Sequence, residues 1–221
     1  MKGTLCTKSC HPQRPCTNVS MPEGASVKIN VIDEDLTLSS GSSKVEPNLW
    51  QNCGGIILLE THRNAIEEGE WLCDEVINAC QLLLKNQYPI IRGFQSTLLA
   101  DSYAMDPQTS AEFLQILNVN RNHWILISTV NCPPSTVDVY DSMHLSLSPR
   151  LKKLVADLLQ SPSKEITIRY CDVQWQSGGS DCGIFALVFA TSICNGIDPV
   201  TVTFIQSRMR SHHLLCVEKQ F

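Results

Sequence analysis

The residues that could do chemistry are concentrated in one short segment, Gln176–Gly183 (QSGGSDCG). It runs into an apolar stretch that predicts a buried helix over 181–195, with Cys182 in its first turn. A thiol in that position lies near unpaired backbone N–H groups and the positive end of the helix dipole, which both favour the thiolate. Glycine lets a substrate chain approach the sulfur, so Gly179 and Ser180 are candidate substrate-binding residues. Cys182 is therefore a candidate nucleophile, with a packing role as the alternative.

A nucleophilic cysteine needs a base, and the base needs a group that orients it. His123 precedes an alternating segment, and Asp141 ends the next expected strand. The Cys-Pro-Pro segment between the two strands is a turn by composition, so an antiparallel hairpin would bring both residues to the same end of a sheet. We predict His123 as the base and Asp141 as its orienting acid. Asp138 is the rival acid, but it alternates with two valines and is expected to face solvent.

Besides a nucleophile, a base and an orienting acid, acyl transfer requires a group that donates a hydrogen bond to the oxyanion. Gln176 lies six residues before Cys182, and a side-chain amide near the nucleophile can hydrogen-bond a developing oxyanion. Removing one such donor from other enzymes costs about 2.7–4 kcal/mol. Gln176 is therefore a candidate oxyanion donor.

The pattern along the chain indicates an α+β fold, because helices flank a run of strands without regular βαβ alternation. Hydrophobic spacing and cap signals, among them Ser148-Pro149 and Asp198-Pro199, predict the elements. The expected helices lie at about 69–85, from 149 through 158, at 181–195, and from 199 towards 216. The expected strands lie at 113–117, 124–130, 136–141 and 166–170.

The first fifty residues differ from the rest, and we expect a flexible leader at 1–50 and the folded domain at 51–221. A cluster of possible zinc ligands lies in the leader, at Cys6, Cys10, His11 and Cys16. Its spacing fits no standard pairing of zinc ligands, and the chain carries a net charge of −5. A zinc-dependent nucleic-acid binder is therefore the weaker alternative.

Composition bounds the remaining expectations. Hydrophobic residues make up 43% of the chain, enough for a sizeable core. The chain has 11 cysteines, but its first residues lack the apolar region of a secretory signal. We therefore expect mostly reduced thiols in an intracellular protein of the nucleus or cytoplasm, a monomer with no membrane or nucleic-acid partner.

Three motifs together resemble the signature of the Ulp/sentrin-type cysteine proteases, which are specific for ubiquitin-like proteins and related to the adenovirus protease. These motifs are HW at 123–124, YDS at 140–142 and QxxGSDCG at 176–183. The segment Trp71–Asn78 is similar to the WLND-type segment of that family, and the chain order His, Asp, Cys also fits. The resemblance covers roughly residues 69–217.

The resemblance implies a papain-like fold of the Ulp/adenain type, in which a central helix carrying the cysteine packs against a mixed sheet carrying His and Asp. It implies a thiol protease that cleaves after the C-terminal Gly-Gly of a ubiquitin-like modifier of the SUMO, NEDD8 or ubiquitin class, in a precursor or a conjugate. No metal or organic cofactor is implied. Carried over by position, Cys182 is the nucleophile, His123 the general base, Asp141 its orienting acid and Gln176 the oxyanion donor.

Two tryptophans are candidate substrate contacts. Trp124 follows the expected base directly, and Trp71 is expected to open a helix that the family places beside the cleft. Flat rings on both sides of a bound chain would leave no room for a Cβ, which would select Gly-Gly. Core packing is the alternative for each ring.

The sequence also departs from the family. Cys73 stands where the WLND pattern has Asn, and Phe94–Thr97 is unlike the corresponding stretch of the well-known SUMO proteases. These differences leave the identity of the modifier open. A catalytically silent module that binds a ubiquitin-like protein is the main alternative, and a transposon-derived origin is left open, since short forms of this domain occur beside mobile-element genes.

Overall fold

A five-stranded mixed sheet organises the domain in this computed structural model, which describes residues 48–108, 112–146, 148–160 and 165–221. The strands lie in the order β3-β4-β5-β6-β7, and the two outer pairings are parallel while the inner ones are antiparallel. Their bounds are Arg92–Gly93, Phe113–Val119, His123–Ser128, Thr136–Tyr140 and Thr167–Tyr170. The described residues belong to one compact unit, Val45–Phe221, and the cysteine cluster of the leader lies outside them.

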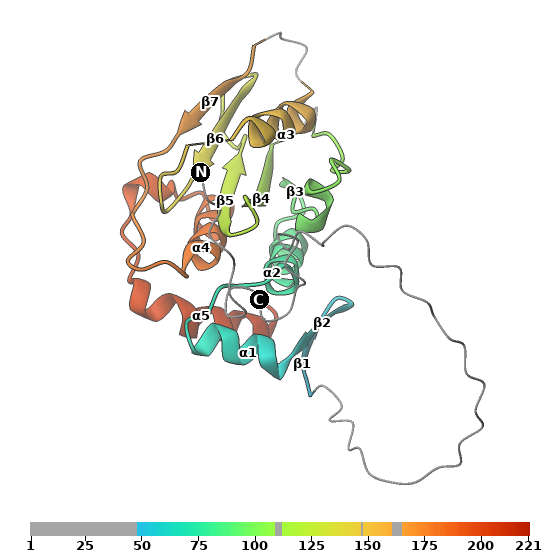
Figure 1. The fold of residues 1–221 in the computed structure, drawn as a ribbon, viewed down its shortest axis with the longest axis vertical. Coiled ribbons are helices and arrows are strands. Elements are labelled where there is room, and N and C mark those ends of the chain that lie inside the picture. Colours follow the sequence, from blue (N-terminus) through green and yellow to red (C-terminus); the bar gives the residue numbers. More distant parts are fainter. Residues whose placement is uncertain (1–47, 109–111, 147, 161–164) are drawn as a thin grey trace, which may run out of the picture. The chain divides into compact units, whose positions relative to one another are not determined.

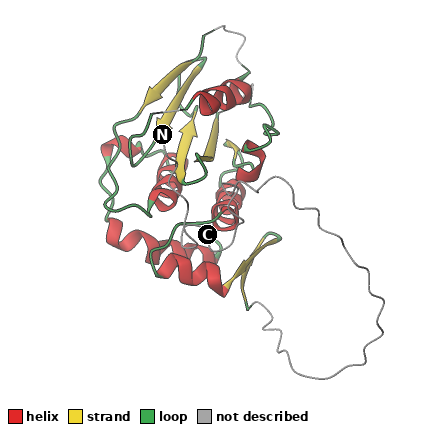
Figure 2. Ribbon diagram, in the orientation of Figure 1, coloured by secondary structure: helices red, strands yellow, loops and turns green. Residues whose placement is uncertain are grey.

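Side-chain alternation along the strands divides the core between the two faces of the sheet. On β4, Leu114 and Ile116 pack with helices α2 (Asp74–Gln87) and α4 (Cys182–Cys194). Phe113 and Leu117 of the same strand point to the other face and join the cluster of helix α3 (Pro149–Leu159). Figures 1 and 2 show these helices around the sheet. The α+β prediction is confirmed.

Helix α4 is apolar on nearly all sides because it is packed on nearly all sides. Eight of its residues are buried, and its first residue is Cys182. Phe189 lies at the centre of a ring cluster, with centroid distances of 6.2 Å to Tyr140, 5.6 Å to Phe185 and 5.8 Å to Phe204. Such tilted aromatic pairs fix the helix against β6 and against the segment that leads to the last helix.

The hairpin of β5 and β6 carries the predicted base and acid. Its register pairs Leu126 with Tyr140 and Ser128 with Asp138. The turn between the strands uses left-handed backbone at Asn131 and Ser135, with φ of 57° and 59°. Because the strands are antiparallel, the first residue of β5 and the residue that follows β6 lie at the same end of the sheet.

The C-terminal helix begins later than the sequence predicts. Asp198 caps only a short 3-10 helix, Pro199–Thr201, and α5 spans Gln206–Lys219. The chain between them is extended, because Phe204 exchanges backbone hydrogen bonds with the Gln174 side chain, which accepts from the Phe204 N–H at 2.6 Å and donates to the Phe204 carbonyl at 3.1 Å. The expectation of one continuous helix from 199 was therefore wrong.

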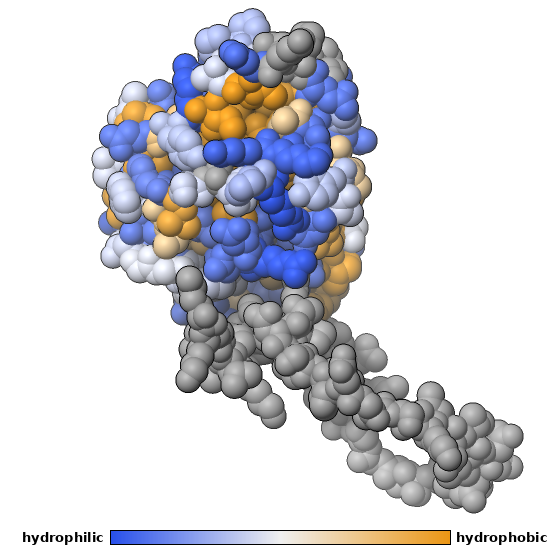
Figure 3. Space-filling model, turned by 45° about the horizontal axis from the view of Figure 1, so that its top comes forward, coloured by the Kyte–Doolittle hydropathy of each residue, from blue (hydrophilic) through white to orange (hydrophobic). Residues whose placement is uncertain are grey.

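The sequence patterns also gave no sign of three N-terminal elements. These are the hairpin strands β1 (Leu49–Cys53) and β2 (Ile56–Leu59), followed by helix α1 (Glu60–Glu67). Helix α1 packs along α5. The face drawn in Figure 3 is mostly hydrophilic, with hydrophobic residues gathered in a patch near its upper end. Within the described part of the chain, every helix is too short or too polar to cross a membrane.

Truncating Phe189 tests whether the ring cluster holds α4 in place. Phe189→Ala should lower the free energy of unfolding by about 3–5 kcal/mol, because it removes a fully buried ring and leaves a cavity. Urea unfolding measures the change, with Ile90→Ala as the control, since Ile90 is 91% exposed and should shift stability by less than about 0.5 kcal/mol. Equal urea midpoints for the two variants would contradict this account.

Candidate active site

Cys182 occupies the first position of α4 and is 2% exposed. A bend at Ser177–Ser180 leads into it, and Gly178 in this bend has a φ of +83°. The next residue, Gly183, allows the helix to lie close to its neighbours. A Cβ there would come within 3.1 Å of the Trp124 ring and 3.2 Å of Leu72. The helix start that carries the thiol is therefore fitted tightly against β5 and the segment before α2.

His123 and Asp141 form a buried pair at the end of the β5–β6 hairpin. His123 Nε2 and Asp141 Oδ1 are 2.6 Å apart, and the side chains are only 3% and 4% exposed. The carboxylate is held further by backbone N–H groups, with Met143 donating to Oδ1 and Leu145 donating to Oδ2, both at 2.8 Å. These bonds fix the carboxylate, and the carboxylate fixes the imidazole ring.

Contacts within the pair favour the protonated imidazole and the ionised carboxylate. Burial opposes protonation of His123, but hydrogen bonds and charges of Asp141 and Cys182 outweigh it and raise the pKa of His123 to about 9. Burial also disfavours the Asp141 carboxylate, yet the bonds from His123 and Met143 together lower the pKa of Asp141 below its usual value. The structure thus favours an imidazolium beside a carboxylate.

The two ring nitrogens of His123 have different surroundings. Nε2 is engaged by Asp141, whereas Nδ1 is buried and makes no hydrogen bond to any of the described residues. Cys182 also raises the pKa of His123, and because Asp141 engages Nε2, Nδ1 is the nitrogen left for a proton exchanged with the thiol. A proton on Nδ1 would therefore be shared with the sulfur of Cys182.

Gln176 is held by hydrogen bonds to the loop that follows Asp141. Its Oε1 accepts from Ser142 Oγ at 2.7 Å, and its backbone N–H donates to the Ser142 carbonyl at 3.0 Å. Its Nε2 donates to the Gly178 carbonyl at 3.0 Å. A side-chain amide has two N–H donors, so one of them is left for an oxyanion.

The four predicted substrate-binding residues have internal contacts of their own. Trp71 is 52% exposed and donates from Nε1 to the Gly179 carbonyl at 2.9 Å, while the Ser180 carbonyl accepts from Arg210 at 3.2 Å. Trp124 is 4% exposed and donates to the Leu72 carbonyl at 2.9 Å. Trp71 lies three residues before α2 begins, so it does not open that helix as the sequence analysis expected.

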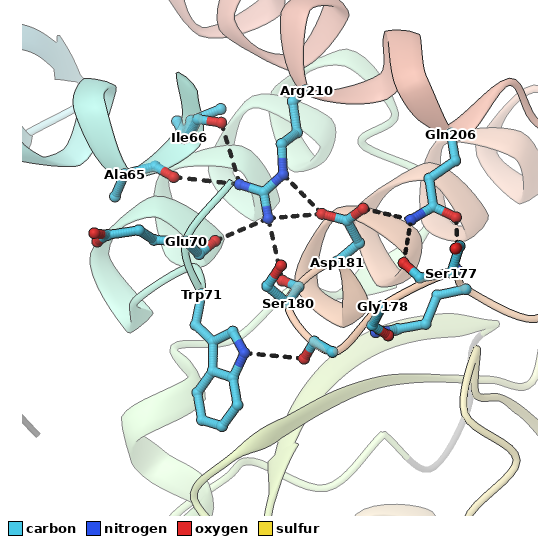
Figure 4. A network of polar contacts seen from close by, with 12 residues as sticks. Ala65, Ile66, Glu70, Trp71, Ser177, Gly178, Ser180, Asp181, Gln206 and Arg210 are labelled. Carbon is cyan, nitrogen blue, oxygen red and sulfur yellow. Dashed lines mark hydrogen bonds and ion pairs between the residues drawn. The ribbon is translucent and has the colours of Figure 1, made fainter. Parts of the chain in front are cut away.

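Arg210 of α5 is a residue that the sequence analysis missed. Its Nε and Nη2 both lie 2.7 Å from Asp181 Oδ1. Figure 4 shows how the same guanidinium also reaches backbone carbonyls of α1, of the chain that follows α1 and of the bend. These carbonyls belong to Ala65, Ile66, Glu70 and Ser180. An isolated arginine on a helix gives no sequence signal for such a role.

The expectation that Asp138 faces solvent was wrong. Asp138 is 7% exposed, and Arg169 of the neighbouring strand β7 binds both of its oxygens, at 2.6 and 2.8 Å. Alternation predicts exposure only for a sheet with one open face, and every residue of β6 is buried. The Asp138 carboxylate is therefore bound by Arg169 and not by His123.

A cluster of possible metal ligands lies at His62, Cys73 and Glu75, whose ligand atoms are within 4.8 Å of one another. His62 Nδ1 already accepts the Leu59 N–H at the start of α1, at 3.1 Å. In a neutral ring this bond places the proton on Nε2, so no nitrogen lone pair is left for a metal. The local hydrogen bonding thus favours a helix cap over a metal site.

Comparison with known proteins identifies the fold. Residues 113–211 match the model of the Ulp1 protease family, C-terminal catalytic domain. The Ulp1 protease domain in complex with Smt3, the yeast ortholog of SUMO, has a TM-score of 0.62 and 16% identity, over 80% of this chain and 90% of that chain. The Ulp1-like SUMO protease catalytic domain of Chaetomium thermophilum has a TM-score of 0.53 and 17% identity, over 82% and 85%. No curated protein matches the chain in sequence. The resemblance predicted from the motifs is confirmed.

The two aspartates near the hairpin should differ sharply when the charge of each is removed. Asp141→Asn should reduce turnover roughly 10⁴-fold, because the imidazolium loses its carboxylate partner. Asp138→Asn should keep normal turnover and lower the melting temperature, because it weakens the bond to Arg169. Steady-state kinetics and thermal melts separate the two effects. A larger kinetic loss for Asp138→Asn would show that the orienting acid is wrongly assigned.

The raised pKa of His123 makes stability depend on pH. Since the folded pKa, about 9, lies above the usual 6.5, protonation of His123 stabilises the fold fully below pH 6.5 and progressively less as the pH rises through 9. The difference in unfolding free energy between wild type and His123→Gln should therefore shrink from pH 6.5 to pH 9.5. Urea unfolding across this range measures it, and a difference that grows with pH would refute the assignment.

Proposed function

We propose that this chain, which carries a catalytic domain of the Ulp1 protease family, is a thiol protease that cleaves after the C-terminal Gly-Gly of a ubiquitin-like modifier. The observation that supports this most is the buried His123–Asp141 pair beside Cys182 at the start of α4. The nucleophile comes from a different element than the hairpin that carries the base and its orienting acid, and a packing role for the cysteine would not require these three groups to meet.

The reaction proceeds by acyl transfer through a thioester. His123 carries on Nδ1 the proton that Cys182 has given up, and the Cys182 thiolate attacks the carbonyl carbon of the last glycine. The oxyanion is stabilised by the Cys182 backbone N–H and by the free amide proton of Gln176. When the C–N bond breaks, His123 gives its proton to the leaving amine. Water, deprotonated by the same ring, then hydrolyses the thioester and releases the modifier and the thiol.

The relatives and one exposed ring support a proposal for the substrate class. One similar domain was solved in complex with the yeast ortholog of SUMO, and another is described as a SUMO protease, which supports a substrate of the SUMO class of ubiquitin-like modifiers. Trp71, which is bonded to Gly179, offers a flat surface beside the bend that leads to Cys182. A chain without Cβ atoms would fit along the exposed face of that ring, next to the bend. The buried Trp124 acts by fixing Leu72 and Gly183.

Covalent labelling with modifier proteins that carry a C-terminal electrophile tests the function. We expect a SUMO-class probe to label wild type, with intact-mass analysis showing one added modifier, and Cys182→Ala to show none. Cys194→Ala is the matched control, since Cys194 ends the same helix and should label normally. Trp71→Ala should label several-fold more slowly with the Gly-Gly probe and gain tolerance for an Ala-Gly probe.

The outcomes separate the competing functions. Binding of the modifier without labelling would replace the protease with a silent binding module. Labelling by a NEDD8 or ubiquitin probe alone would keep the protease and overturn the SUMO class. Labelling that persists in Cys182→Ala would overturn the assignment of the nucleophile.

A further inference from the structure

Asp181 occupies the N-cap position of α4 but does not cap the helix. Aspartate is among the best capping residues, because its carboxylate accepts N–H groups of the first turn. The Asp181 side chain makes no such bond, whereas Ser148 caps α3 and Asp198 caps the short 3-10 helix in the ordinary way. Helices α1, α2 and α5 also lack a side-chain cap, but their N-cap residues, Leu59, Cys73 and Ile205, are not good capping residues, whereas Asp181 is.

The carboxylate of Asp181 is directed instead towards α5. Arg210 binds its Oδ1 through two nitrogens, each at 2.7 Å, and Gln206 Nε2 donates to its Oδ2 at 2.5 Å. The Asp181 and Arg210 side chains are only 18% and 14% exposed, so solvent screens the pair weakly. Figure 4 shows Arg210 and Gln206 reaching the Asp181 carboxylate from α5, one on each side of it.

Both holding residues are themselves fixed. Arg210 donates to four carbonyls, those of Ala65, Ile66, Glu70 and Ser180. Gln206 accepts the Ser177 N–H at 2.9 Å and donates to the Ser177 carbonyl at 2.8 Å. The carboxylate is therefore bound by groups that cannot easily follow it if it turns back to α4.

We propose that Arg210 and Gln206 are positioning residues that hold the Asp181 carboxylate away from the first turn of α4. A carboxylate turned inward would accept the N–H groups of Gly183 or Ile184 and would place a negative charge beside the sulfur and the oxyanion. Held outward, it leaves the helix start positive for the Cys182 thiolate. The benefit for turnover rests on the proposed protease function, but the state of the thiol does not.

The test is the pH dependence of Cys182 alkylation by iodoacetamide, followed by mass spectrometry of the peptide that contains Cys182. Arg210→Gln should shift the alkylation midpoint upward by roughly one pH unit, because Asp181 is released with its charge. Asp181→Asn should not shift it upward. The double variant Arg210→Gln/Asp181→Asn should return the midpoint to near that of wild type, because an asparagine that turns inward carries no charge.

The double variant separates this role from a purely structural one. If Arg210 merely ties the bend to α1, the double variant will behave like Arg210→Gln or worse, and the proposal is overturned. Arg208→Gln is the matched control, since Arg208 is exposed on the same helix and should leave the midpoint unchanged.

A milder variant covers the case in which Arg210→Gln does not fold, as judged by its thermal melt. Gln206→Met removes one donor to Asp181 and should give a smaller upward shift, again reversed by Asp181→Asn; no shift would count against the proposal. Alkylation needs no modifier. If the alkylation midpoint of the variant does not shift while wild type still reacts with modifier probes, this inference alone is rejected. If the alkylation midpoint shifts as expected but no modifier probe labels the protein, the proposed protease function alone is rejected.

Discussion

The charged pair of His123 and Asp141 is the interaction on which the rest of the site depends. Burying two charges is costly, and the cost is offset only when the geometry is good and the remaining lone pairs are satisfied. The geometry is good, because the ring nitrogen lies 2.6 Å from the carboxylate, and the carboxylate is satisfied, because it also accepts two backbone N–H groups. Those N–H groups belong to the turn after β6, so the end of the hairpin must keep its shape for the pair to remain charged.

The nucleophile is positioned by contacts that join segments far apart in the sequence. Trp124 donates to the carbonyl of Leu72, and its ring lies 3.1 Å from where a Cβ on Gly183 would be. The bend before Cys182 is held on one side by Trp71 and on the other by Arg210. Since each contact joins a different element to the same short loop, the thiol is fixed by the whole fold rather than by its own helix.

Local patterns predicted most of the helices and strands after residue 69 but not the first hairpin and α1, and long-range contacts account for the misjudged roles of single residues. The capping Ser148 and the apolar run after Cys182 act within their own helices, and the hairpin that joins His123 to Asp141 spans only neighbouring strands, so all could be read from the sequence. The burial of Asp138 depends on Arg169 of another strand, and the role of Arg210 depends on α1 and the bend. Neither dependence leaves a periodic signal, which is why sequence reasoning could not find them.

The electrostatic surroundings of Cys182 depend on which hydrogen-bond donors bind the carboxylates of Asp141 and Asp181. Asp141 points its charge at the far nitrogen of His123, so the ring presents a proton rather than a negative charge to the sulfur. Asp181 points its charge at Arg210. Both carboxylates are thus close to Cys182, but each is bound by another side chain, Asp141 by His123 and Asp181 by Arg210. The positive charges that remain facing the sulfur are the imidazolium and the start of α4, and both stabilise a thiolate.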